Sequence, residues 1–177
     1  ELSLKEVNTA AKLAKRLKAL KYDVTEKVGG TGVVAVMKNG SGPVLLIRAD
    51  MDGLPVVEQT GLEFASKVRT KTPEGVETGV MHACGHDGHM AILLGAAKVL
   101  SDMRDQLRGS VKFIFQPAEE GGGGARFMIE DGVLENPKVD EIYGLHLWNY
   151  QPYGTVGAKA GPILAAAGVF TITGRGK

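Results

Sequence analysis

Three of the four histidines and the only cysteine of this chain lie within eight residues, from His82 to His89. Cysteine and histidine are the ligands that zinc and related metals prefer. Cys84 and His86 are two residues apart, which would place them on different faces of a helix, so both reach one ion only from a loop. Asp87 and His89 could then hydrogen-bond the ligands. The alternative is a polar loop in which Asp87 caps a helix and Cys84 is an inert buried thiol, but the clustering favours a metal or catalytic site.

A second group is the adjacent pair Glu119 and Glu120, which four glycines follow. Two carboxylates side by side repel each other unless a cation or a shared proton compensates. A metal ion is such a cation, and one carboxylate could bind it while its neighbour takes a proton from water. The alternatives are a solvated acidic turn and a phosphate-binding loop. The second of these is weak because the glycines are not followed by Lys-Ser or Lys-Thr.

Two further positions carry groups that could bind metal. Asp50 and Asp52 are two apart on an extended segment, so their side chains point the same way, either to a ligand or into a cap or turn. His146 lies in an apolar segment, where an isolated histidine is commonly a core residue. It gains interest because it would complete a ligand set with Cys84, His86 and Glu120.

The hydrophobic pattern predicts the elements that must position these groups. Helices are expected at 4–20, 88–100 and 125–131. Strands are expected at 24–28, 33–38, 44–47, 111–115, 141–147 and 169–173, with a loop or exposed hairpin at 66–80. This order predicts an α/β fold with a largely parallel sheet flanked by helices. Ligands bind such sheets at the carboxyl ends of the strands, where the polar groups above are expected to converge on one cleft.

The overall composition is that of a globular domain. The chain has 177 residues, 44% of them apolar and 23% charged, and a net charge of +1. These values argue against a disordered chain and against nucleic-acid binding by bulk charge, and no apolar run approaches a membrane span. A single cysteine excludes an internal disulfide, and the first 20 residues are too charged for a signal peptide, so a cytoplasmic location is expected.

Four segments together resemble a known family. They are IRADMDGLP (47–55), MHACGHDGH (81–89), FQPAEEGG (115–122) and GLHLW (144–148). Present in this order, they closely resemble the amidohydrolase branch of the aminoacylase/carboxypeptidase metallopeptidases. That branch includes hydrolases of hippurate, of N-acyl amino acids and of indole-acetyl amino acids.

The resemblance implies a two-metal site on an α/β catalytic domain, into which a smaller lid or dimerisation domain is inserted. It implies four metal ligands in this chain, namely Cys84, His86, Glu120 and His146. Glu119 would be the general base, which activates a water molecule and passes its proton to the leaving amine. Asp52 matches an aspartate beside the family's site, while Asp50, His82, Asp87 and His89 receive no definite role. Zinc or manganese is expected, and cobalt or nickel is also compatible with such ligands.

Members of the family are much longer than this chain. Residues 1–167 are therefore expected to be the N-terminal part of the catalytic domain, and 168–177 the first strand of a truncated lid. One further ligand histidine and groups that bind substrate are expected outside the chain. The segment alone is then expected to be inactive and to expose a sheet edge.

The function implied for the parent protein is metal-dependent hydrolysis of the amide bond of N-acyl amino acids or small peptides. Neither nucleic acid nor membrane is expected as a partner, and the resemblance allows a homodimer formed through the lid. One alternative is a thiol hydrolase with Cys84 as nucleophile and His86 or His82 as base. Another is a non-catalytic structural fragment that binds metal weakly.

Overall fold

The computed structural model describes residues 1–72, 75–164, 168 and 170–176, and the chain divides into two compact units, Glu1–Leu147 and Trp148–Lys177. The first unit contains every helix and strand that the described residues form. In the second unit, the described residues 170–173 form no strand, contrary to the prediction for 169–173. Val169 itself lies outside the described residues.

The main sheet of the described residues has five strands in the order β1-β2-β6-β3-β7. These strands are β1 (Asp23–Val28), β2 (Gly32–Asn39), β3 (Val44–Asp50), β6 (Gly109–Gln116) and β7 (Glu141–Gly144). β3 runs parallel to β6 and β7, whereas β2 is antiparallel to both β1 and β6. The predicted sheet flanked by helices is confirmed, but it is mixed rather than largely parallel. The turn between β1 and β2 is too short for the crossover that parallel neighbours need.

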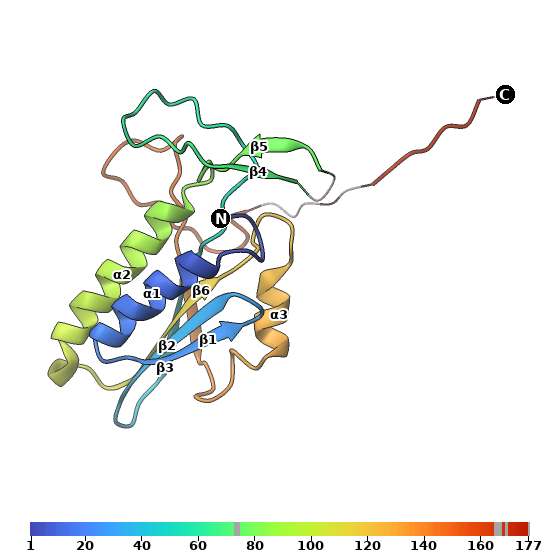
Figure 1. Cartoon of the computed structure of the whole chain (residues 1–177). Helices are drawn as coiled ribbons and strands as arrows, with labels where there is room; N and C mark the ends of the chain where they lie inside the picture. The colour runs from blue at the N-terminus through green and yellow to red at the C-terminus, as the bar shows by residue number, and fades with distance from the viewer. Residues whose placement is uncertain (73–74, 165–167, 169, 177) are drawn as a thin grey trace. The chain divides into compact units, whose positions relative to one another are not determined.

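Helices cover both faces of this sheet (Figure 1). α1 (Val7–Ala19) and α2 (His86–Asp102) pack on one face, and α3 (Gly124–Glu130) packs on the other. Side chains alternate accordingly along β2, where Val33, Ala35 and Met37 face α1 and α2 while Val34 faces the side of α3. The central strands are therefore buried on both faces, which explains their nearly continuous apolar sequences.

The boundaries of the helices differ from those predicted. α1 begins only at Val7, whose side chain is 63% exposed, and its buried face is formed by Ala10, Leu13, Ala14 and Leu17. α2 begins at His86, two residues before the predicted start, so His86 and His89 belong to the first turn of a helix rather than to a loop. The predicted strand at 141–147 ends at Gly144, which leaves His146 in the segment after it.

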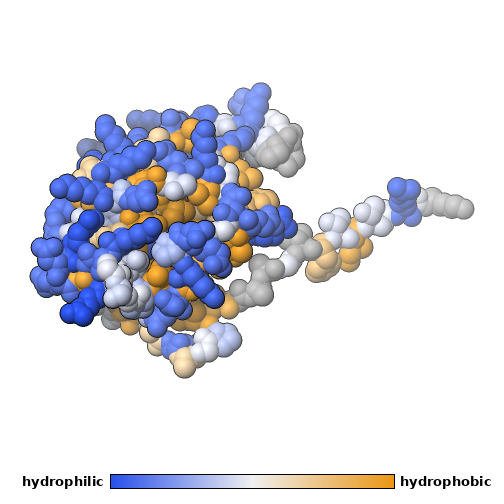
Figure 2. Space-filling view, turned by 90° about the horizontal axis from the view of Figure 1, so that it is seen from below, coloured by the Kyte–Doolittle hydropathy of each residue, from blue (hydrophilic) through white to orange (hydrophobic). Residues whose placement is uncertain are grey.

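Two smaller elements complete the described structure. β4 (Arg69–Lys71) and β5 (Glu77–Gly79) pair antiparallel and confirm the predicted hairpin. A 3-10 helix, η1 (Arg104–Gln106), follows α2. In the view from below, hydrophilic side chains surround apolar patches on the surface (Figure 2). No helix of the described residues has the length and apolarity that crossing a membrane requires.

The sheet ends on an exposed edge. β7 pairs only with β3 among the described residues, and all four of its residues are exposed. Ile142 is 58% exposed and Tyr143 54% exposed. The expectation of an exposed sheet edge is thus confirmed.

A buried lysine ties the sheet to the chain after α3. Lys112 lies on β6, is 1% exposed and was not singled out by the sequence. Its ammonium group donates hydrogen bonds to the backbone carbonyls of Val133, Glu135 and Pro137, at 2.8, 2.7 and 2.9 Å. All three donors of the lysine are therefore used, which offsets the cost of burying its charge.

Candidate metal centre

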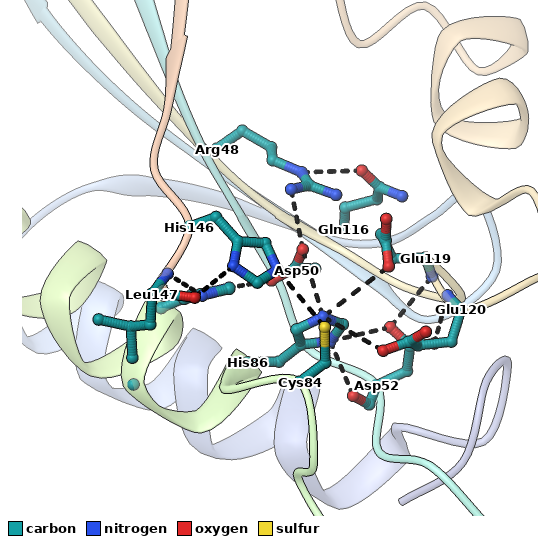
Figure 3. A network of polar contacts seen from close by, with 12 residues as sticks. Arg48, Asp50, Asp52, Cys84, His86, Gln116, Glu119, Glu120, His146 and Leu147 are labelled. Carbon is teal, nitrogen blue, oxygen red and sulfur yellow. Dashed lines mark hydrogen bonds and ion pairs between the residues drawn. The ribbon is translucent and has the colours of Figure 1, made fainter. Parts of the chain in front are cut away.

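The groups singled out by the sequence meet at one edge of the sheet (Figure 3). Asp50 is the last residue of β3, and Asp52 follows it. Glu119 and Glu120 come shortly after the end of β6, and His146 comes after β7. Because these three strands are parallel, their carboxyl ends lie at the same edge, where α2 also begins. The predicted convergence is confirmed.

His86 lies at the centre of the cluster and is 1% exposed. Its Nδ1 lies 2.9 Å from the backbone oxygen of Asp52, an arrangement in which Nδ1 carries the proton and donates it. Nε2 is then the atom with a free lone pair. It lies 3.5 Å from Asp50 Oδ2, 3.7 Å from Glu120 Oε1 and 3.8 Å from Glu119 Oε2.

The backbone before His86 brings Cys84 to the same place. Gly85, the N-cap of α2, has a φ of +81°, a left-handed conformation that glycine adopts without strain. Cys84 therefore stands outside the helix, and its Sγ lies 3.4 Å from His146 Nε2. His146 Nδ1 is 2.6 Å from the backbone oxygen of Leu147, which leaves Nε2 as the ring atom that faces the thiol. The loop predicted for both residues is found at Cys84 but not at His86, which is the first residue of α2.

His89 is close to the cluster but both of its ring nitrogens are occupied. Nδ1 lies 2.6 Å from Asp50 Oδ1, and Nε2 accepts the backbone N–H of Leu147 at 2.9 Å. A metal ion would have to displace one of these bonds. His89 instead links β3 to the segment that carries His146, and the ion pair of Asp50 with Arg48, at 2.8 Å, extends this chain of contacts.

Asp52 is held by donors from two distant parts of the chain. Its carboxylate accepts hydrogen bonds from Ser3 Oγ at 2.7 Å, from the Glu119 N–H at 3.0 Å and from the Glu120 N–H at 3.1 Å. Burial disfavours the charged form of Asp52, but contacts with His86 and with these donors outweigh burial and hold its pKa well below the usual range. Asp52 therefore remains an anion that orients both His86 and the two glutamates.

Two of the predicted residues, Asp87 and His82, are not placed to share a metal ion with the others. The Asp87 side chain is exposed and accepts the N–H of Gly88 at 2.9 Å, so it is neither the N-cap of α2 nor a contact of the four predicted ligands. His82 is half-buried, and burial lowers the pKa of its ring. Its Nδ1 is buried without a hydrogen-bond partner.

The cluster satisfies a simple test for a cation site. His86 Nε2 and Glu120 Oε1 are both buried without a hydrogen-bond partner, and they face each other at 3.7 Å. Two ligands of one tetrahedral ion, each about 2.1 Å from it, are separated by roughly 3.4 Å. Among the described residues, three sets of metal-competent atoms each lie within 4.8 Å of one another, and all three include His86. Two of them are Cys84–His86–His146 and His86–Glu119–Glu120. In the third set, Asp50–His86–His89, the His89 ring and the Asp50 carboxylate already contact each other at 2.6 Å.

Sequence reasoning missed several polar residues that support the cluster. Arg48 Nε donates to Gln116 Oε1 at 2.9 Å, so the guanidinium bridges β6 and Asp50. An arginine inside an otherwise apolar strand could have signalled a buried anionic partner. Ser3 and Glu6 were also missed, and no local signal points to their partners, which are distant in sequence.

Comparisons with known proteins agree with this geometry. The model of the peptidase family M20/M25/M40 matches residues 46–172. The chain is 45% identical to N-acetylcysteine deacetylase of Bacillus subtilis, over 100% of this chain and 44% of that protein. It is 43% identical to IAA-amino acid hydrolase ILR1-like 2 of Arabidopsis thaliana, over 99% of this chain and 38% of that protein.

A solved structure shows the same fold. The crystal structure of the Bacillus subtilis YXEP protein, described as a dinuclear metal binding peptidase from the M20 family, superposes with a TM-score of 0.81 at 45% identity. The match covers 92% of this chain and 43% of that one. The chain thus spans about two-fifths of the length of the relatives that it matches.

Proposed function

The chain belongs to peptidase family M20/M25/M40, and from this membership we propose that its parent protein hydrolyses the amide bond of N-acyl amino acids, with Glu119 as general base. Because the chain spans 44% of the length of the deacetylase relative, the proposal concerns the whole protein. The observation that carries it is the convergence of Cys84, Glu120 and His146 around His86, whose Nε2 is buried without a hydrogen-bond partner.

These four residues would hold two divalent metal ions, and zinc or manganese suits such ligands. Bound metal would polarise the amide carbonyl and lower the pKa of water. In His86 and His146, Nδ1 faces a backbone oxygen, so Nε2 is the ring atom turned toward the cluster. The hydrogen bonds of Asp52 to the amides of Glu119 and Glu120 hold the two glutamates beside His86.

Glu119 is placed differently from its neighbour. Its side chain is 40% exposed against 21% for Glu120, while its carboxylate still lies 3.8 Å from His86 Nε2. A carboxylate between the ligand cluster and solvent can take a proton from a water molecule and return it to a leaving amine. Glu120, whose Oε1 is buried, suits metal binding instead.

The names of the relatives support the substrate class. One relative is a deacetylase of N-acetylcysteine and another is a hydrolase of IAA-amino acids, so both names describe an acyl group linked to an amino acid. A further relative, at 45% identity, is thermostable carboxypeptidase 1 of Saccharolobus solfataricus, which extends the class to peptides. We infer a small N-acyl amino acid or peptide as substrate.

Three further assignments belong to this proposal. Residues 1–167 form part of the catalytic domain, and 168–177 begin the inserted lid. Dimerisation would use that lid, and the protein would be cytoplasmic. The length of the relatives supports the division, since more than half of each lies outside the matched region.

The surroundings of Cys84 disfavour the thiol-hydrolase alternative. Burial, followed by the nearby carboxylates of Glu120, Glu119 and Asp50, raises the pKa of the Cys84 thiol to about 11. A nucleophilic cysteine needs a lowered pKa, so this thiol suits metal binding better than attack on a carbonyl. Its ring partner is His146 rather than His86 or His82.

The test uses the full-length parent protein and a panel of N-acyl amino acids. Glu119→Gln is expected to keep its metal and to lose activity by about 10²- to 10⁴-fold, as removal of a general base does. Glu120→Gln is expected to lose metal. Glu130→Gln, an exposed glutamate on α3, is the matched control and should change neither.

A chelator should abolish activity, and added zinc or manganese should restore it. The proposal is wrong if the purified protein lacks near-stoichiometric metal and Glu119→Gln retains full activity. It is also wrong if activity resists chelators but is lost on alkylation of Cys84. A full-length protein that binds metal but hydrolyses none of the panel would favour the non-catalytic alternative.

A further inference from the structure

The segment 117–120, here called the carboxylate turn, carries both glutamates of the site in an unusual backbone conformation. Ala118 has a φ of +49° and is completely buried. The side chains of Glu119 and Glu120 lie 3.7–3.8 Å from His86, beyond hydrogen-bond distance. The positions of these two side chains therefore depend strongly on the hydrogen bonds that fix the backbone of this turn.

Three successive N–H groups of the carboxylate turn point at two buried carboxylates. The N–H of Ala118 donates to Glu6 Oε1 at 2.9 Å. Those of Glu119 and Glu120 donate to the two oxygens of Asp52. Hydrogen bonds to ionised acceptors are stronger than neutral ones, so this arrangement fixes the turn firmly.

Glu6 occupies the N-cap position of α1, but its side chain does not cap that helix. The Glu1 carboxylate instead accepts the N–H groups of Asn8 and Thr9, at 3.2 and 2.8 Å. Glu6, which is completely buried, bonds through its second oxygen to Thr31 Oγ1 at 2.5 Å. A buried carboxylate is costly, and here it connects the start of α1 to the carboxylate turn rather than to its own helix.

Ser3 reaches the same turn through Asp52. Its hydroxyl donates to Asp52 Oδ2 at 2.7 Å, the same oxygen that accepts the N–H of Glu120. The N-terminal segment, dark blue in Figure 1, therefore supplies one of the two carboxylates that hold the turn, that of Glu6, and contacts the other, that of Asp52. Ser3 and Glu6 lie three residues apart on this one segment.

We propose that Ser3 and Glu6 are positioning residues of the metal centre, which hold the carboxylate turn so that Glu119 and Glu120 face His86. The inference rests on the proposed function, because it concerns the same two glutamates. Neither residue touches a predicted ligand side chain. Both act through the backbone of the turn, Glu6 directly and Ser3 through Asp52.

The test compares Glu6→Leu, Ser3→Ala and Glu6→Gln in the full-length protein. Tyr22→Phe is the control, since it removes a buried hydrogen bond to the Ala97 carbonyl, about 16 Å along α2 from His86. Two quantities are measured: amide hydrogen exchange at 118–120 in the metal-free protein, and the zinc dissociation constant by competition with a chromophoric chelator.

Glu6→Leu should speed exchange at Ala118 by at least about tenfold and weaken zinc binding by about 10- to 100-fold. Ser3→Ala should raise exchange at Glu119 and Glu120 and weaken zinc binding several-fold. Glu6→Gln keeps an acceptor oxygen for Ala118 but loses the charge, so its effects should have the same direction as those of Glu6→Leu and be clearly smaller. Tyr22→Phe should change neither quantity at the site, even where it lowers thermal stability.

The proposal is overturned if Glu6→Leu and Ser3→Ala match Tyr22→Phe in exchange and zinc affinity. Ser3→Ala alone decides the question if Glu6→Leu does not fold, because its side chain is small and only partly buried. Exchange is measured without metal, so it still decides whether the turn is held if the native protein binds no zinc. In that case the proposed function fails, while the exchange result stands by itself.

Discussion

Replacing Asp52 by asparagine changes a single atom type at the point where three donors meet. Oδ2 accepts from Ser3 and Glu120, and Oδ1 accepts from Glu119. In Asp52→Asn, the amide oxygen can serve the first two donors, but the NH₂ group then faces the N–H of Glu119. Two charge-assisted bonds become neutral bonds, and one backbone donor loses its partner.

The expected cost follows from these three bonds. Converting a charged acceptor to a neutral one costs about 1 kcal/mol per bond, and an unpaired buried N–H costs about 1–3 kcal/mol. Because the donors are only partly buried and the turn can relax, we expect a loss of about 3 kcal/mol in the free energy of unfolding. For a chain of this size that lowers the melting temperature by about 6–12 °C. Metal affinity should fall by about 10- to 100-fold, since the same bonds orient Glu120 and His86.

The assay pairs thermal unfolding with a chelator-competition titration of zinc. Asp87→Asn is the matched control, because it makes the same chemical change on an exposed carboxylate in the first turn of α2. That control should keep the native melting temperature within about 1 °C and leave zinc affinity unchanged, as exposed substitutions commonly do. Equal effects of the two substitutions on zinc affinity would refute the role assigned to Asp52.

Three other predictions concern stability. Lys112→Met leaves three backbone carbonyls without their donor, so the free energy of unfolding should fall by about 3 kcal/mol in a urea titration. Burial raises the pKa of Tyr22 from 10.0 to about 12, so the folded state holds this proton more tightly. Native stability should therefore fall by about 2 kcal/mol as pH rises from 10 to 12, and a shallower fall in Tyr22→Phe would confirm the cause. In Gly95→Ala the new Cβ meets no atom within 4 Å, so this substitution should stabilise α2 by about 0.5–1 kcal/mol. In Gly124→Ala the new Cβ lies 1.9 Å from the Pro117 carbonyl oxygen, so this substitution should destabilise the protein. Denaturant unfolding of both variants shows whether the free energy of unfolding rises or falls.

Local sequence patterns were sufficient to predict most of the helices and strands and the types of residue that could bind metal. The apolar run at 44–47 predicted a strand, and its continuity is typical of a strand buried on both faces, which has no solvent-facing positions. The spacing of Cys84 and His86 required a break in helical geometry, and Gly85 provides it. These features depend on residues within a few positions of one another, so they can be read without knowledge of the rest of the chain.

Contacts between segments that are distant in the sequence could not be predicted from local patterns. Whether β2 pairs parallel or antiparallel with β6 depends on a partner more than 70 residues away. The spacing of apolar residues predicted a helix at 4–20, but it did not reveal that Val7 is exposed while Ala10 faces the sheet. His86 and His89 have the same side chain, so the sequence alone does not distinguish their roles. Only the neighbours of each ring identify His86 as a candidate ligand and His89 as a residue that links β3 to the segment of His146.

The residue types and their order along the chain therefore establish what this molecule can bind, because metal preference resides in the side chains themselves. Folding establishes which of those side chains remain available. It places the Nε2 of His86 among carboxylates and engages both nitrogens of His89. It also brings Glu6 to the N–H of Ala118, 112 residues away, a pairing that no local pattern encodes. The physical reason is that ligand chemistry is a property of single residues, whereas hydrogen-bond partners are a property of the space into which the whole chain packs them.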